Sequence, residues 1–261
     1  YNKDSKELDK MLAINNELYK KNINSHLIIP NRFNNIITKV NNDNYILLKI
    51  ISANDNNSIT DITSFQNKTV TNKKILNKWG SLWASKVDYY EYQISQLGRD
   101  KKYILDYFNY YVGLCENAIC YVNKIDKLKT DERIVLAHRR IIYPNNNLNF
   151  YNPLNYTFDL EVRDIAEYIK SLFINQDDYL YELRDYLSMV RLSSYSYHML
   201  YARLLYPSFF FDVLDEVMNK DIKEDDALKY VNVPDKYERF LKECYLEISK
   251  YATLDKIDWI I

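Results

Sequence analysis

The sequence predicts an α+β protein that is mostly helical, with a small β-containing N-terminal part and a larger helical C-terminal part. Short β-branched runs cluster between residues 27 and 50, and helical periodicity of apolar residues dominates from Ser81 onward. Glycine occurs only 3 times in 261 residues, which argues against a glycine-rich phosphate loop, because such loops need several residues without a side chain. The expected division is residues 1–78 and residues 79–261.

The N-terminal part is predicted to begin with a helix and to continue as a small antiparallel sheet. Residues 5–21 carry apolar side chains at helical spacing, and β-branched runs follow at residues 27–29, 35–40 and 45–50. Residues 41–44 read Asn-Asn-Asp-Asn, which favours a turn because these residues tolerate left-handed backbone. Residues 53–74 are polar, and we expect a loop there with one further strand near residues 59–65.

Two long helices are predicted to open the C-terminal part. One apolar stripe runs from Leu82 to Leu97, with Ser81 and Gly98 as expected caps, and a second stripe runs from residue 104 to 122. Further helices are expected at residues 162–173, 177–190, 194–205, 208–219 and 236–251. Prolines at 207 and 234 lie at or just before helix starts, where proline is tolerated. The aromatic residues of 206–211 are expected to pack in the core.

Charge and cysteine content narrow the class of protein. The 35 basic and 36 acidic residues leave a formal net charge of -1, which argues against nucleic-acid binding. The 3 cysteines lack CxxC spacing and predict reduced thiols in a cytoplasmic protein. No apolar run is long enough to span a bilayer. The 26 tyrosines fit an AT-rich coding bias, and the alternative is a tyrosine-rich contact surface.

Residues 133–173 contain the pattern of a phosphoryl-transfer site. An apolar strand ending in His138, an asparagine further along, a second short strand and a helix that opens on Arg-Asp follow the order of kinase catalytic centres. In that order Arg140 holds the position of the catalytic base, Asn145 that of the loop asparagine and Asn152 that of the second metal ligand. Arg140 cannot accept a proton, because a guanidinium has no acceptor and stays charged near neutral pH. Asn152 lacks the negative charge that holds Mg²⁺.

Other interpretations of single residues stay open. Lys49 lies at the end of a predicted strand, where a kinase places the lysine that contacts nucleotide phosphates, although solvated lysines are common there. His138 is expected to be a structural loop histidine, since no other histidine has ligand spacing to it. Asp164 opens a helix and is expected to anchor the loop by accepting backbone amides.

The two loop arginines and two later carboxylates offer further alternatives. Arg139 and Arg140 could bind an anionic ligand. Arg140 could instead pair with Asp159 or Glu161 and lock the loop. If the register is shifted, Asp159 rather than Asn152 supplies the metal ligand.

The ordered set of motifs resembles the CotS/YutH-like spore coat proteins of endospore-forming Firmicutes, relatives of the aminoglycoside and choline phosphotransferases. The resemblance rests on the order of a strand, His138 and Asn145, followed by a second strand and Asn152. It also rests on the sequence Arg-Asp-Ile-Ala-Glu-Tyr at 163–168 and on residues 82–91, 111–119 and 202–207. The resemblance implies a protein-kinase-like fold with a reduced N-lobe (residues 1–78) and a helical C-lobe (residues 79–261).

The resemblance and the missing charges together predict a catalytically degenerate kinase-like protein, a pseudokinase of the spore coat or of sporulation. We expect it to bind other coat or sporulation proteins, with no cofactor, no metal, no nucleic acid and no membrane as partner. We expect it in the cytoplasm or in the spore coat. The alternative is a divergent small-molecule phosphotransferase that uses ATP and Mg²⁺, with Asp159 or Glu161 as metal ligand. The residues between Lys49 and Trp79 look too few for the regulatory helix of a complete N-lobe.

Overall fold

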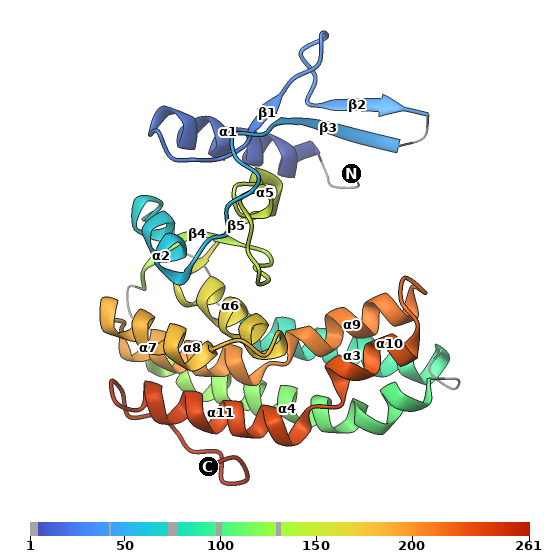
Figure 1. Ribbon diagram of the computed structural model, residues 1–261, viewed down its shortest axis with the longest axis vertical. Helices are drawn as coiled ribbons and strands as arrows, with labels where there is room; N and C mark the ends of the chain where they lie inside the picture. Colours follow the sequence, from blue (N-terminus) through green and yellow to red (C-terminus); the bar gives the residue numbers. More distant parts are fainter. Residues whose placement is uncertain (1–4, 42, 73–77, 98–100, 129–131) are drawn as a thin grey trace.

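The computed structural model describes residues 5–41, 43–72, 78–97, 101–128 and 132–261, and these confirm the predicted mostly helical α+β arrangement. Figure 1 shows α1 and a three-stranded sheet at one end of the molecule and a layered set of helices at the other. The elements are α1 (Ser5–Lys20), β1 (Leu27–Ile29), β2 (Ile37–Val40), β3 (Asp43–Lys49), α2 (Ile59–Lys68), α3 (Trp79–Leu97), α4 (Lys102–Ile125), η2 (Asp126–Leu128), β4 (Ile134–His138), α5 (Asn147–Phe150), η3 (Pro153–Asn155), β5 (Tyr156–Leu160), α6 (Val162–Ile174), α7 (Tyr179–Met189), α8 (Ser194–Leu205), α9 (Ser208–Met218), α10 (Glu224–Val231) and α11 (Pro234–Ile248).

The N-terminal helix and the antiparallel sheet were both predicted correctly. Strand β3 pairs with β2 over its first half and with β1 over its second half. Asn15 on the buried face of α1 accepts a hydrogen bond from the Ile28 N–H at 3.0 Å, which holds β1 against α1. Asn41 has a φ of 56°, as expected for the turn between β2 and β3, while Asn42 lies outside the described residues.

The strand expected near residues 59–65 is wrong, because these residues form helix α2. Ser58 and Asp61 form a capping box, in which each side chain accepts a hydrogen bond from the backbone N–H of the other. Ile59, Ile62 and Phe65 are buried at helical spacing. The residues between Lys49 and Trp79 therefore do hold a helix. It contacts β4, α6 and α7, so it packs on the helical part of the molecule.

The C-terminal helices surround α8. All residues from Tyr195 to Leu205 are buried, and α8 contacts α4, α6 and α11. Helix α3 begins at Trp79, so Ser81 lies inside the helix and is not its cap, and Gly98 lies outside the described residues. Helix α10 was not predicted, because its eight residues are too few for a clear apolar stripe.

Stacked aromatic rings fill the core around α9, as predicted for residues 206–211. Phe210 stacks on Tyr111 with 4.1 Å between ring centroids, and Phe211 stacks on Tyr90 at 4.5 Å. Tyr206 stacks on Trp83 at 4.7 Å. These contacts join α9 to α3 and α4. The described cysteines are free thiols, two of them buried.

The second strand of the catalytic-type region lies later in the chain than predicted. A strand was expected just before Asn152, but residues 147–150 form the helical turn α5, and the strand β5 follows Asn152. Asn146 caps α5 by accepting a hydrogen bond from the Asn149 N–H at 3.0 Å. Strand β5 then pairs antiparallel with β4, with His138 opposite Tyr156. None of the helices within the described ranges is long and apolar enough to cross a bilayer.

We expect Phe210→Ala to lower the free energy of unfolding by about 3–5 kcal/mol, because the ring is 0% exposed and its loss leaves a cavity beside Tyr111. Urea denaturation measures the change. Phe33→Ala is the matched control, since this ring is 69% exposed, and it should cost less than about 1 kcal/mol. Equal losses in the two variants would contradict the packing described for α9.

Candidate functional site

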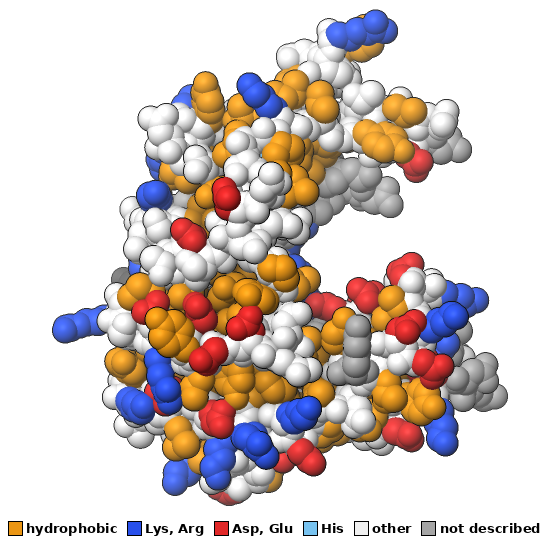
Figure 2. Space-filling model, in the orientation of Figure 1, with side chains coloured by type: hydrophobic (Ala, Val, Ile, Leu, Met, Phe, Trp, Pro, Cys, Tyr) orange, Lys and Arg blue, Asp and Glu red, His pale blue; other side chains and the backbone are white. Residues whose placement is uncertain are grey.

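The loop after β4 lies between the sheet and the helical part of the molecule (Figure 1). Figure 2 shows that the molecule is hollowed on one side, between the β2–β3 hairpin and helices α9 and α10. The loop carries most of the residues that the sequence assigned to a phosphoryl-transfer site, and helix α6 holds it from one side.

Asp164 fixes His138 at the start of the loop. One carboxylate oxygen of Asp164 accepts a hydrogen bond from the His138 backbone N–H, and the other contacts Nδ1 of the ring, each at 2.8 Å. Nε2 lies 2.8 Å from the carbonyl oxygen of Phe150, whose ring stacks on the imidazole. Both ring nitrogens therefore face oxygen atoms of the protein. This geometry makes His138 a structural residue, and no ring nitrogen points to an open site.

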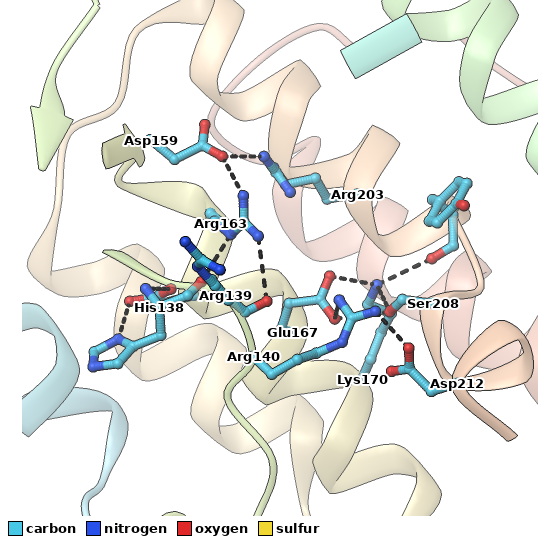
Figure 3. A network of polar contacts seen from close by, with 12 residues as sticks. His138, Arg139, Arg140, Asp159, Arg163, Glu167, Lys170, Arg203, Ser208 and Asp212 are labelled. Carbon is cyan, nitrogen blue, oxygen red and sulfur yellow. Dashed lines mark hydrogen bonds and ion pairs between the residues drawn. The ribbon is translucent and has the colours of Figure 1, made fainter. Parts of the chain in front are cut away.

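Arg163, the neighbour of Asp164 in the first turn of α6, binds the backbone carbonyls at the start of the loop. Its Nε donates to the carbonyl oxygen of His138 at 2.8 Å, and its Nη2 donates to that of Arg139 at 3.2 Å. Figure 3 shows the guanidinium between these carbonyls and Asp159. Consecutive residues of α6, Arg163 and Asp164, thus bind the acceptors and the donors of one loop segment.

The Asp159 carboxylate accepts four hydrogen bonds. Oδ2 accepts hydrogen bonds from Arg163 at 2.7 Å and Arg203 at 2.9 Å, while Oδ1 accepts from the Leu160 N–H at 2.8 Å and the Trp79 indole at 3.3 Å. Burial alone would raise the pKa of this carboxyl, but the charges of Arg203 and Arg163 lower it below its usual value. A metal ion would have to displace two guanidiniums, which argues against Asp159 as the metal ligand.

Glu161, the other carboxylate considered for metal binding, also pairs with a guanidinium. The Arg133 guanidinium lies 2.7 Å from the Glu161 carboxylate. The Glu161 backbone carbonyl accepts a hydrogen bond from the Gln66 side chain of α2 at 2.9 Å. Burial raises the pKa of Glu161, and Arg133 offsets only part of this effect. The residue therefore ties α2 to the end of β5.

Arg140, which the sequence assigned to the position of the catalytic base, pairs with carboxylates of α6 and α9. Its Nη2 donates to Asp212 at 2.5 Å, and its Nη1 lies 3.8 Å from Glu167 (Figure 3). The predicted pairing of Arg140 with Asp159 or Glu161 is wrong, because these carboxylates form ion pairs with Arg163 and Arg133.

Glu167 is the centre of a second buried network. It accepts hydrogen bonds from Lys170 at 3.0 Å and from the Ser208 hydroxyl at 2.7 Å, and Lys170 also donates to Ser208 at 2.7 Å. Burial would raise the pKa of Glu167, but Lys170 and Arg140 lower it to about 2. The carboxylate is therefore charged at neutral pH and holds Arg140 against α6.

Arg139 forms an ion pair with Glu7 of α1. The neighbouring loop arginines thus reach in different directions, Arg139 to the N-terminal helix and Arg140 to α9. Each guanidinium already has a carboxylate partner, so an anionic ligand would have to compete with Glu7 and Asp212.

The remaining predicted positions do not form one site. Asn145 is 2% exposed, its carbonyl accepts hydrogen bonds from Asn57 at 2.7 and 2.9 Å, and its Nδ2 has no partner among the described residues. Asn152 caps η3 by accepting from the Leu154 N–H at 3.0 Å. Lys49 is exposed at the end of β3, and no described carboxylate forms an ion pair with it. Within the described ranges, no three His, Cys, Asp or Glu side chains are grouped so that they could hold a metal.

Several residues of the network were missed from the sequence. Glu167 and Lys170 follow Asp164 at intervals of three residues, so their common helix face could have been found from the spacing. Arg203 and Asp212 carried no such signal, because their roles arise from how α8 and α9 pack against α6.

Comparison with known proteins gives three findings. A family model described as "Spore coat putative kinase YutH" matches residues 1–244. The chain is 28% identical over 191 residues to the endospore coat-associated protein YutH of Bacillus subtilis (strain 168), a match that covers 64% of this chain and 55% of that protein. The chain thus spans about half the length of this relative.

Among solved structures, the fold is similar to an aminoglycoside phosphotransferase from Alicyclobacillus acidocaldarius subsp. acidocaldarius DSM 446. The TM-score is 0.65 at 12% identity, over 93% of this chain and 83% of that chain. At this identity the likeness concerns the fold alone. The three findings confirm the resemblance and the kinase-like α+β fold that the sequence predicted.

We expect Asp164→Ala to lower the free energy of unfolding by about 3 kcal/mol, because it leaves the buried N–H and Nδ1 of His138 without an acceptor. Chemical denaturation measures the loss. Asp225→Ala, at an exposed position of α10, should change stability by about 0.5 kcal/mol or less. If the two variants were equally stable, Asp164 would not be the anchor of the loop.

Proposed function

The chain belongs to the YutH family of spore coat proteins with a kinase-like fold, and from this premise we propose that it is a catalytically degenerate member that acts by binding other proteins of the coat. The observation that carries the proposal is Arg140, which stands at the position of the catalytic base and is committed to ion pairs with Asp212 and Glu167.

Phosphoryl transfer to a hydroxyl needs a group that accepts a proton and orients the nucleophile. Arg140 offers only donors, and its pKa is raised further by the carboxylates around it although burial opposes this shift. Its contacts also fix it in place, with α6 on one side and α9 on the other. The position of the base has therefore become part of the packing of the helices.

The positions that would hold a nucleotide-bound magnesium ion do not fit one. Asn145 keeps the asparagine of the catalytic loop, but the second position carries the neutral amide Asn152, where a hard cation between phosphates needs a carboxylate. Asn145 is buried and its backbone carbonyl is bound by Asn57, while the side-chain oxygen of Asn152 is used in a cap. Asp159, the nearby carboxylate considered as a substitute, is bound by Arg163 and Arg203. These contacts favour the degenerate protein over a divergent phosphotransferase.

Exposed apolar side chains support a role in protein binding. Phe33, Tyr45 and Leu47 of the N-terminal part are more than half exposed, as are Tyr89 and Tyr92 on α3. Such side chains gathered on a surface are typical of contact sites. The high tyrosine content is only partly a surface property, because other tyrosines are fully buried in the core. The coat protein similar to this chain makes the spore coat the place where we expect these contacts.

The proposal predicts that millimolar ATP with Mg²⁺ leaves the midpoint of thermal unfolding within about 1 °C of its value without ligand, since a ligand that does not bind the native state cannot stabilise it. ADP formation should stay at the level of a protein-free control. A rise in the midpoint, together with turnover that is lost in Lys49→Ala or Asn145→Ala, would overturn the loss of catalysis.

The location is tested separately. A fluorescent fusion of the chain, produced during sporulation of Bacillus subtilis, should form a ring at the spore surface, because the proposal rests on binding to coat proteins. The same fusion with Phe210→Ala controls for signals from unfolded chain. Diffuse fluorescence of the wild-type fusion in the mother cell would speak against a coat component.

A further inference from the structure

His26 lies where four segments of the chain meet. Its backbone N–H donates to the carbonyl oxygen of Tyr151 at 2.8 Å, and its carbonyl accepts from the Asn15 side chain on α1 at 2.7 Å. Its ring contacts Leu148 of α5 and Ile51, which follows β3. We call these contacts of His26 with Asn15, Ile51, Leu148 and Tyr151 the lobe junction. His26 is 0% exposed.

The two ring nitrogens of His26 face groups of opposite kind. Nε2 lies 3.1 Å from the carbonyl oxygen of Leu148, and a carbonyl can only accept, so Nε2 carries the hydrogen. Nδ1 lies 3.4 Å from the backbone N–H of Ile51, and an N–H can only donate, so Nδ1 must present its lone pair. The junction therefore fits one neutral tautomer of the ring.

We propose that His26 is a pH-sensitive connector between the N-terminal part and the loop region. Protonation places a hydrogen on Nδ1, directly against the N–H of Ile51, in a site without solvent. Two donors then face each other, which releases residues 50–57 from the region around α5. Burial lowers the pKa of His26 below its ordinary value, and the acceptor Leu148 offsets only part of this effect.

Among the described residues, no charged side chain stabilises the protonated ring of His26, because its pKa is shifted only by burial and by backbone hydrogen bonds. The α1 residue that contacts His26 is Asn15, and Ser25 precedes His26 in the chain; both are uncharged. Residues 141–158 contain no Asp, Glu, Lys, Arg or His.

The charged side chains at the end of β3 and in the segment after it are exposed. Lys49 and Asp55 are exposed, and Asp55 accepts a hydrogen bond from Asn147 at 3.4 Å. Tyr151 presents its ring edge to the imidazole at 6.2 Å. His138, in contrast to His26, has a carboxylate beside its ring, that of Asp164.

The sign of the effect follows from the direction of the pKa shift. A histidine with a lowered pKa in the folded state binds its proton more readily when the junction is open. The closed junction is therefore fully stable above the ordinary histidine value of about 6.5 and loses stability as the pH falls below it. Each pH unit reduces the ratio of closed to open junction by up to about tenfold, until the folded pKa is reached.

Hydrogen exchange of the whole chain, followed by mass spectrometry at pH 7.5 and pH 5.0 and corrected for the intrinsic rates, tests this. We expect residues 24–30, 50–57 and 146–152 to lose about tenfold in protection at the lower pH, while α4 and α8 keep theirs. In His26→Gln the amide retains a donor for Leu148 but does not titrate, so the difference between the two pH values should vanish. His198→Gln is the matched control, because His198 is buried in α8, its Nδ1 contacts the Ser194 carbonyl of its own helix turn and its ring lies against Tyr121, away from the junction.

Unchanged protection of the junction in the wild type between the two pH values would overturn the proposal. So would an undiminished pH response in His26→Gln. If that variant does not fold, NMR titration of the wild-type histidine rings decides, and a His26 ring that titrates at or above about 6.5 contradicts the connector.

Discussion

The pair of hydrogen bonds from His138 to Asp164 is the contact on which the rest of the site depends. Asp164 lies in the first turn of α6, where its carboxylate binds both the backbone and the ring of His138. Arg163 beside it binds the carbonyls of the same segment. The start of the loop is fixed in this way. From it, Arg139 pairs with Glu7 of α1 and so connects the two parts of the molecule, while Arg140 pairs with Asp212 of α9 within the helical part.

The loop of a kinase-like fold thus serves here to hold elements together. In a phosphotransferase the same positions would carry the base and the metal ligands. In this chain the proposed base position is an arginine within an ion-pair network, and the Asn152 side chain caps η3. The electrostatic attraction within this network stabilises the native fold. The proposed loss of catalysis and the contacts that hold the loop therefore rest on the same side chains.

Part of this could be predicted from the sequence and part could not. Long helices and the sheet follow from periodicity, and the anchor role proposed for Asp164 follows from an acidic residue in a first helix turn. Helix α2 was mistaken for a strand, because its β-branched residues outweighed the capping box of Ser58 and Asp61. The partners of Arg140 could not be found, since Asp212 lies far along the chain and reaches the loop only through the packing of α9.

Helix α8 has a consequence for how such chains diverge. Its residues from Tyr195 to Leu205 are all buried, so no face of this helix is exposed to solvent, where substitutions would be tolerated. Helices α4 and α11, which pack against α8, do have exposed positions on which substitutions are nearly neutral. We therefore expect α8 to change most slowly over evolutionary time. A distant relative that has lost every loop motif should still be recognisable by an uninterrupted, bulky helix of this kind in the middle of its C-terminal half.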